Sequence, residues 1–193
     1  MKVLDTKYVD VTTWGQIGFS DSTPNPSRVQ VGPKLTYDPW TYLTFGVNYS
    51  YFQKEALNSA TGEFETSGEH RAEFEVDPHY TFENGIQINV RNRWEHRWFI
   101  QAGGENDRTR HRLELVFPVK HAGPLTDVFT SAEFFYDWDR DLNSEDRIVP
   151  LGLTFTLARK VKLKAFYMWQ ANQSQPGDWT HSNVFYTQLY LSL

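Results

Sequence analysis

The chain contains histidines and aspartates whose side chains are suited to act together as a general base and its orienting carboxylate. Such a pair performs hydrolysis only when a nucleophile lies within hydrogen-bond reach of the histidine. The candidates near one end of the expected structural elements are His96, His111, His181, Asp107, Asp137 and Asp139. No spacing in the sequence ties a serine or threonine to any of them. The sequence therefore predicts no catalytic residues and leaves a hydrolase as an alternative.

A second candidate for chemistry is the acidic segment 137–146, which reads DWDRDLNSED. Oxygen-bearing side chains recur in it at alternate positions, as they do in calcium-binding loops. However, Leu142 stands where those loops need glycine, and Ile148 replaces the glutamate of the twelfth position. The chain also has no cysteine, which excludes thiolate ligands and thiol nucleophiles. We therefore expect a solvated acidic loop, with no metal and no cofactor.

The largest group of charged residues alternates with other residues along the chain. It comprises Arg71, Glu73, Glu75, Asp77, Arg91, Arg93, Glu95, Arg97, Arg110, Arg112, Glu114, Glu133, Lys162 and Lys164. If residues 83–85 form a three-residue hairpin loop, Glu75 falls opposite Arg93. In the same register Asp77 falls opposite Arg91, and opposite charges across a ladder attract. We predict that these side chains neutralise one another inside a barrel. The alternative is a solvated outer face whose salt bridges contribute little.

Strands are the elements that position such a group, because alternate side chains share one face of a strand. Period-two alternation recurs through the chain, whereas helical periodicity is hard to find. The expected strands are 9–19, 28–37, 42–52, 70–82, 86–98, 109–119, 128–138, 148–157, 161–170 and 183–193. Several have about ten residues, the length that a tilted strand needs to cross a bilayer. Pro150 falls within one of them and is expected to mark a β-bulge.

The connections between the expected strands alternate in length. Short links are expected at 38–40, 83–85 and 158–160, with a somewhat longer one at 120–127, and long polar loops at 20–27, 53–68, 101–107, 139–146 and 171–181. Asn84 and Gly85 form a strong hairpin signal, because both residues tolerate positive φ. Short turns at one end and long loops at the other are typical of outer-membrane barrels. An even number of strands places both termini at the short-turn end.

Aromatic residues gather near both ends of the expected strands. Tyr37, Trp40, Tyr80 and Phe82 lie at the short-turn end, and Tyr49, Tyr51, Trp94, Trp98, Trp138 and Trp169 lie toward the long loops. Two such girdles suit lipid headgroup interfaces, where an amphipathic ring is half wet. A soluble core is the alternative, but it would concentrate rings in mid-strand. The distribution favours apolar side chains that face lipid and charged side chains that face the interior.

The overall composition agrees with a sheet that has two different faces. The 193 residues suit one domain, 1–193, and the formal net charge of −5 argues against nucleic acid as a partner. A mean hydropathy of −0.58 is too polar for a helical membrane protein. Aromatic residues nevertheless make up 16% of the chain, which a barrel with one apolar and one polar face explains. No apolar segment of a secretory signal follows Met1, so we expect an export leader to have been removed.

Two segments carry a family resemblance. RNRWEHR at 91–97 and RHRLEL at 110–115 resemble a family of bacterial outer-membrane β-barrel proteins of unknown function, the domain of unknown function 2490 type. Members show an Arg-Asn-Arg strand, an Arg-Leu-Glu strand, a later segment such as SAEFF at 131–135, and a closing strand. The resemblance covers roughly the second half of the chain. It implies a barrel fold and an outer-membrane location, and it implies no activity.

The sequence therefore predicts an all-β protein, a single up-and-down antiparallel transmembrane β-barrel with short periplasmic turns and longer extracellular loops. We expect a narrow or blocked pore, or a structural membrane protein, with an Arg/Glu-lined lumen in the outer membrane of a Gram-negative-type bacterium. Expected partners are outer-membrane lipid and lipopolysaccharide and, during biogenesis, the barrel assembly machinery. The final strand resembles the signal read by that machinery, although it ends in Leu193 instead of phenylalanine. The alternatives are an outer-membrane hydrolase with a rim active site and a soluble lipocalin-like ligand-binding barrel. The oligomeric state stays open.

Overall fold

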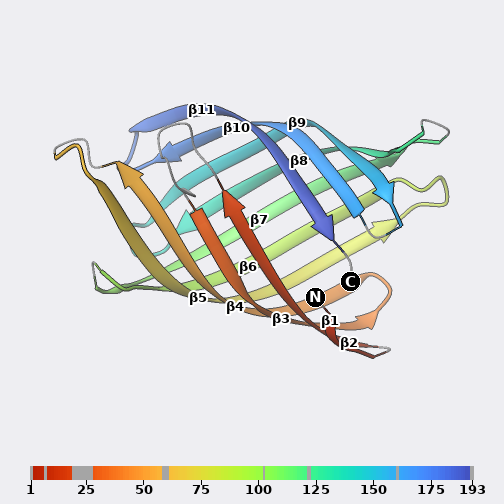
Figure 1. The fold of residues 1–193 in the computed structure, drawn as a ribbon, viewed down its shortest axis with the longest axis horizontal. Coiled ribbons are helices and arrows are strands. Elements are labelled where there is room, and N and C mark those ends of the chain that lie inside the picture. The colour runs from red at the N-terminus through yellow and green to blue at the C-terminus, as the bar shows by residue number, and fades with distance from the viewer. Residues whose placement is uncertain are drawn as a thin grey trace.

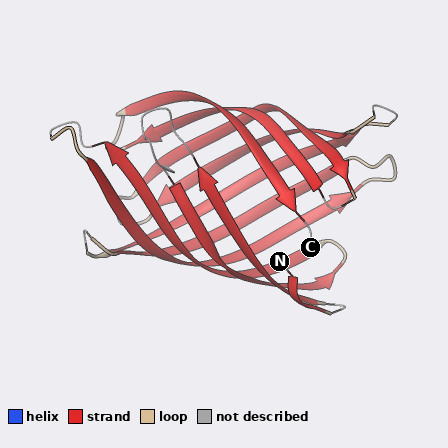
Figure 2. Cartoon of the chain, viewed as in Figure 1, coloured by secondary structure: helices blue, strands red, loops and turns tan. Residues whose placement is uncertain are grey.

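The computed structural model describes residues 2–6, 8–18, 28–57, 61–101, 103–120, 123–159 and 161–191. These residues form one antiparallel sheet of eleven strands, in which each strand pairs with the next one along the chain. The sheet curls strongly about its long axis (Figure 1), and the described elements are all strands (Figure 2). The expected all-β, up-and-down antiparallel topology is confirmed. Within the described residues no helix is long and apolar enough to span a membrane.

Ten of the eleven strands coincide with the ten expected from alternation. The strands are β1 (Lys2–Asp5), β2 (Val9–Gly18), β3 (Arg28–Trp40), β4 (Leu43–Leu57), β5 (Phe64–Thr81), β6 (Gln87–Phe99), β7 (Glu105–Pro118), β8 (Leu125–Asp137), β9 (Leu142–Ala158), β10 (Val161–Gln173) and β11 (Trp179–Leu191). The additional strand, β1, has only four residues, which is too short for alternation to reveal it.

Most strands extend further toward the long-loop end than the sequence predicts. In β4 and β5, Lys54 pairs with Ser67 and Glu55 pairs with Thr66. These extensions carry polar residues on both faces, so they show no alternation, although backbone ladder hydrogen bonds form regardless of side-chain polarity. The loops expected at 53–68, 101–107, 139–146 and 171–181 are therefore shorter, at 58–63, 100–104, 138–141 and 174–178. The expected loop 20–27 and the terminal Leu193 lie outside the described residues, as do Met1, Phe19 and Lys160.

The connections at the other end include 41–42, 82–86, 119–124 and 159–160. The predicted hairpin is confirmed, because Phe82 N donates to Ile86 O at 2.8 Å around residues 83–85. Gly85 has a φ of 88°, which glycine adopts without steric cost. The expected contrast in length between the two ends is only partly right, since 82–86 and 119–124 are about as long as the connection 100–104.

The two edges of the curled sheet approach each other without strand pairing in the described residues. β11 pairs only with β10, and β1 pairs only with β2. Arg28 Nη2 on β3 nevertheless donates to the hydroxyl of Tyr186 on β11 at 2.8 Å. Both chain ends lie on the same side of the molecule (Figure 1). The sheet is thus a partly closed barrel, and full closure of the expected barrel is not observed.

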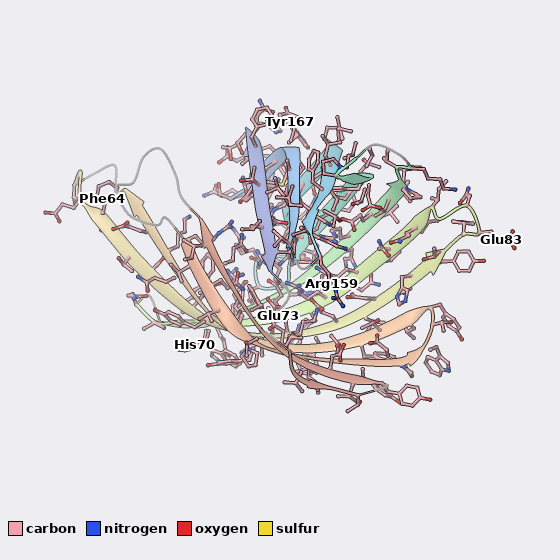
Figure 3. The ribbon with its side chains drawn as sticks, turned by 45° about the vertical axis from the view of Figure 1, so that its right-hand side comes forward. Phe64, His70, Glu73, Glu83, Arg159 and Tyr167 are labelled. Atoms are coloured by element: carbon pink, nitrogen blue, oxygen red, sulfur yellow. The ribbon has the colours of Figure 1, made fainter. Side chains whose placement is uncertain are left out.

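The two faces of the sheet differ sharply in polarity. Glu95 is 0% exposed, whereas the neighbouring Trp94 is 38% exposed. Figure 3 shows Glu73 on the enclosed side of the sheet, while His70 of the same strand and Tyr167 project outside. Exposed apolar side chains of the outer face include Val31, Leu35, Val47, Phe74, Val76, Leu113, Phe117, Phe134, Ile148, Leu151, Phe185 and Leu189. Charged residues are therefore inside and apolar residues outside, the reverse of a soluble barrel.

The inner face is not charged throughout. Phe129, Val149 and Met168 form a buried apolar cluster on β8, β9 and β10. Phe166 and Tyr186 pack against this cluster, with ring centroids 5.3 Å apart. The expected Arg/Glu lining is thus confined to one part of the interior, and an apolar group fills another.

Pro150 lies in a β-bulge, as expected. Thr130 of β8 faces both Pro150 and Leu151 of β9, because the register shifts between Phe129 and Ser131. The register with β10 shifts at the same place, between Tyr167 and Trp169. A bulge removes the need for the missing proline N–H and changes which residues of the strand face inward.

Gly152 follows this bulge and makes room for Phe129. A Cβ atom at position 152 would lie 2.2 Å from the Phe129 ring, which is itself buried. We expect Gly152→Ala to lower the free energy of unfolding by about 1–3 kcal/mol through overpacking. The measurement is a urea titration of the folded protein.

Gly15→Ala provides the control for this substitution. A Cβ atom at position 15 would meet its nearest neighbour, the carbonyl oxygen of Gln30, at an ordinary 3.7 Å. We expect a change within about 0.5 kcal/mol. Equal effects of the two substitutions would show that the space beside Phe129 is unimportant.

Candidate functional site

The charged residues of β5, β6 and β7 form the candidate site on the inner face. Residues directly opposite each other in these strands often carry like charges. The like-charged pairs are Arg71 with Arg97, Glu73 with Glu95, Arg91 with Arg112, and Arg93 with Arg110. Like charges placed directly opposite repel. Many of the attractive contacts must therefore run along a strand or diagonally between strands.

Glu95 is the centre of this arrangement, which we call the Glu95 network. Arg108 Nε donates to Glu95 Oε2 at 2.9 Å, and Arg110 Nη1 donates to Glu95 Oε1 at 2.8 Å. Arg93 Nη1 approaches the same carboxylate at 3.4 Å. A fully buried carboxylate requires such compensation, because its desolvation costs several kcal/mol. Three guanidinium groups supply it here.

Arg110 extends the network toward β9. It also donates to Glu133 Oε1 at 2.9 Å, and Arg147 approaches the other oxygen of Glu133 at 3.8 Å. The buried ring of Phe135 lies beneath the guanidinium groups of Arg108, Arg110 and Arg147, at 4.9, 4.5 and 4.6 Å from its centroid. Cation–π attraction therefore joins three cations of the network around one aromatic ring.

The network continues along β5 in both directions. Toward the long-loop end, Glu69 binds Arg71 and accepts from Arg97 Nη2 at 2.6 Å. Toward the short-turn end, Glu75 binds both Lys34 and Arg93. These ion pairs link β3, β5 and β6 through side chains in addition to the backbone ladder.

The diagonal ion pairs of the network all lean in the same direction. They are Glu69–Arg97, Glu73–Arg93, Glu95–Arg110 and Arg110–Glu133. The residue named second in each pair lies on the later strand. It is two residues nearer the short-turn end than the residue directly opposite the one named first. The contacts thus follow the stagger that tilted strands have in a barrel.

Most of the charged residues expected inside the barrel take part in this network or at its border. The contacts expected from the register are present, since Arg93 binds Glu75 and Arg91 Nε lies 3.5 Å from Asp77 Oδ2. Arg112 and Glu114 form a looser pair at 3.4 Å. Lys162 and Lys164 are exceptions, because the described residues give neither an ion pair. Lys162 is exposed, and the amino group of Lys164 lies 4.7 Å from the Phe129 ring.

Sequence reasoning missed several members of the network. Glu69 and Arg108 precede the expected strands by one residue, so extending the alternation would have found them. Arg147 and Glu145 form an ion pair at 2.6 Å on β9. They lie before the bulge at Pro150, where the inward-facing positions differ from those after it. Lys34 is flanked by Pro33 and Leu35. It therefore belongs to no run of alternating charged residues that would have marked it as inward-facing.

The expected aromatic groups lie on the outer face. Tyr37, Trp40, Tyr80 and Phe82 are exposed at the short-turn end, and Tyr49, Trp94, Trp98 and Trp138 are exposed toward the long loops, with Tyr51 and Trp169 half-buried. Rings also occur between the two groups, as with Phe74, which packs 5.6 Å from Trp94. The outer face therefore has aromatic residues along the strands as well as at their ends.

The histidines and aspartates considered for hydrolysis are only partly brought together. His96 Nδ1 and Asp107 Oδ1 lie 2.8 Å apart, but His111 pairs with Asn92 and His181 stacks on Trp169. Within the described residues, the hydroxyl that hydrogen-bonds to a histidine is that of Tyr49, at 2.8 Å from His70 Nδ1. The His96–Asp107 pair thus has a base and an orienting carboxylate without a hydroxyl nucleophile beside them.

The acidic segment 137–146 uses its carboxylates in contacts with the protein. Arg140 Nε donates to Asp137 Oδ2 at 2.8 Å, and Asn143 Nδ2 donates to Asp146 Oδ1 at 2.8 Å. Asp139 accepts from the Asp107 backbone N–H at 2.8 Å. Across the described part of the chain, no three His, Asp or Glu side chains are grouped as metal ligands would be.

A curled antiparallel sheet with a charged interior and an apolar outer face defines a β-barrel-like protein. Residues 7–181 match the model of a family described as protein of unknown function (DUF2490). The chain belongs to this family. Comparisons with curated proteins and with solved structures gave no match.

The Glu95 network makes a prediction about stability. We expect Glu95→Gln to lower the free energy of unfolding by about 3 kcal/mol, because it removes the charge that compensates three buried guanidinium groups. Urea titration measures the effect. The control is Glu83→Gln in the exposed connection 82–86, where a change within about 0.5 kcal/mol is expected. Similar values for both variants would contradict a central role of Glu95.

Proposed function

We propose that this chain is an outer-membrane β-barrel of a Gram-negative-type bacterium, with no enzymatic activity and no cofactor. Its interior is filled by side chains, so it acts as a structural membrane protein or as a very narrow pore. The observation that carries the proposal is the inverted polarity of the sheet, with buried charges and exposed apolar side chains. Its partners in this role are outer-membrane lipid, lipopolysaccharide and the barrel assembly machinery.

The exposed apolar face supports placement in lipid. Large apolar side chains are exposed on β2 to β9 and on β11. Soluble monomers rarely expose contiguous apolar patches larger than a few hundred Å². In a bilayer the same face lies against hydrocarbon and needs no further cover.

The strand lengths also support this placement. All strands from β3 to β11 have 13 residues or more, whereas a tilted strand crosses the hydrocarbon core with about 9–11. Unpaired backbone groups are not tolerated in hydrocarbon. The proposal therefore includes closure of the barrel, by pairing of β11 with β1 and β2, in the bilayer.

Leu113 provides a direct test of lipid placement. It is exposed on the outer face in the middle of β7, between Val90 and Ala132 of the adjacent strands. We expect Leu113→Arg to destabilise the protein folded in lipid vesicles by about 2–4 kcal/mol, because a charge then enters the hydrocarbon. Urea-dependent folding in vesicles measures the loss. A soluble barrel would instead tolerate arginine on this water-exposed face.

The matched control is Glu63→Arg, in the connection between β4 and β5. This position lies beyond the strands, so the charge change should leave folding in vesicles unaffected. A Leu113→Arg variant that folds as well as this control, and a wild-type chain that stays monomeric and folded without detergent, would overturn the proposal.

The packed interior predicts a very small conductance. Phe135 is fully buried, with the guanidinium groups of three arginines packed on its ring. Glu95, which binds two of these arginines, is also fully buried. A small barrel of ten or eleven strands that is filled in this way leaves little open channel. We expect planar bilayers with the refolded chain to show no current steps or only very small ones. Large and stable steps would contradict the filled interior.

Phe134 and Phe135 allow a matched comparison, because adjacent residues of β8 face opposite sides. Phe134 is exposed on the outer face. We expect Phe135→Ala to raise the conductance by removing the ring from the interior, and Phe134→Ala to leave it unchanged. Equal conductance in both folded variants would exclude a filled interior as the cause of low current.

A further inference from the structure

A cavity lies beyond the Glu95 network, on its short-turn side. Its volume is about 270 Å³, and Arg91, Arg112, Asp77, Glu114, His79 and Asn89 are among its lining residues. A single water molecule occupies about 30 Å³ in the liquid. The cavity thus has room for a small solute, and polar side chains from β5, β6 and β7 line it.

Two arginines lie side by side in the lining of this cavity. Arg91 and Arg112 are directly opposite in the ladder between β6 and β7, so their charges repel. The two side chains are 31% and 29% exposed, compared with 14% for Arg110 of the Glu95 network. Their guanidinium groups remain accessible from the cavity.

Protein carboxylates hold these two arginines only loosely. Arg91 Nε lies 3.5 Å from Asp77 and 3.9 Å from Glu75. Arg112 Nη2 lies 3.4 Å from Glu114. By comparison, Arg110 makes contacts of 2.8 and 2.9 Å with two carboxylates. Within the described residues, neither Arg91 nor Arg112 has the paired, parallel hydrogen bonds that a guanidinium makes with a bound oxyanion.

Asp77 adds a second requirement for a ligand of this cavity, beyond the negative charge that the arginines favour. Its Oδ1 atom is buried and has no hydrogen-bond partner among the described residues, while Oδ2 faces Arg91. A buried acceptor without a donor is costly. The Asp77 side chain is 19% exposed and lines the cavity, so a ligand with a hydroxyl or ammonium group next to its anionic group would supply a donor to this carboxylate.

We propose that this cavity, the arginine pocket, binds a small organic oxyanion that carries a hydrogen-bond donor beside its carboxylate or phosphate. The anionic group lies between Arg91 and Arg112, whose planar forks suit oxyanions. The neighbouring hydroxyl or ammonium group donates to the Asp77 carboxylate. Hydroxy acids, amino acids and phosphoethanolamine groups share this chemistry. Binding in the arginine pocket does not require a conducting pore, because the pocket lies on the short-turn side of the Glu95 network and a solute need not pass through that network.

The first test compares glycolate with acetate, which lacks only the hydroxyl group. Isothermal titration calorimetry of the purified full chain should show tighter binding of glycolate, by about tenfold, because one hydrogen bond to a charged group has about that effect. Arg91→Gln and Arg112→Gln should each weaken glycolate binding by about tenfold or more. Arg159→Gln, at an exposed residue directly after β9 at the same end, should leave it unchanged.

Asp77→Ala separates the donor requirement from the anion requirement. This variant frees Arg91, so acetate should bind at least as well as it does to the wild-type chain, while the preference for glycolate should disappear. A retained preference would overturn the role of Asp77. Absence of heat with glycolate, glycine and inorganic phosphate at millimolar concentrations would overturn the pocket, as would unchanged binding in both arginine variants. Urea titration of each variant verifies that it is folded.

Nanodiscs distinguish a free solute from a lipid headgroup as the occupant. Phosphatidylethanolamine carries a phosphate next to an ammonium donor, whereas the quaternary group of phosphatidylcholine has no N–H. Weaker glycolate binding in phosphatidylethanolamine discs identifies the headgroup as a competitor for the pocket. Equal binding in both discs identifies a free solute. Failure of either test leaves the lipid placement, tested at Leu113, unaffected.

Discussion

The burial of Glu95 is the constraint on which the rest of the interior depends. A carboxylate removed from water is stable only when cations surround it, and Arg93, Arg108 and Arg110 come from two adjacent strands to do so. Like charges stand directly opposite each other at several positions, so the attraction depends on diagonal contacts between residues of neighbouring strands. The burial of these carboxylates is therefore tied to the stagger between the charged strands.

The outer face follows from the same arrangement. With the charged groups facing one another inside, the apolar residues of every strand must face outward, because adjacent side chains alternate between faces. The resulting surface is apolar, with aromatic residues both in mid-strand and toward the strand ends, as Phe74 and Trp40 illustrate. The apolar cluster around Phe129 is a local exception, and it lies where β8 to β10 pack around the bulge at Pro150.

The sequence predicts the fold well because alternation requires only that one face be apolar. Alternation gives no indication of a strand where both faces are polar, so the sequence predicts a loop where the end of β4 pairs with the start of β5. The site was predicted in part. Glu75–Arg93 follows from the hairpin at Gly85, but diagonal contacts such as Arg110–Glu133 depend on strand stagger, which a single sequence does not reveal. The bulge at Pro150 was expected, yet its effect on Arg147 required the actual register.

The common lean of the diagonal ion pairs has a mechanical consequence. Sliding each strand away from the side on which its diagonal partner lies would lengthen Glu69–Arg97, Glu95–Arg110 and Arg110–Glu133 together. The side chains thus resist shear in that one direction, in addition to the backbone hydrogen bonds of the ladder. In a closed barrel the stagger and the number of strands together determine the diameter, and these ion pairs depend on that same stagger.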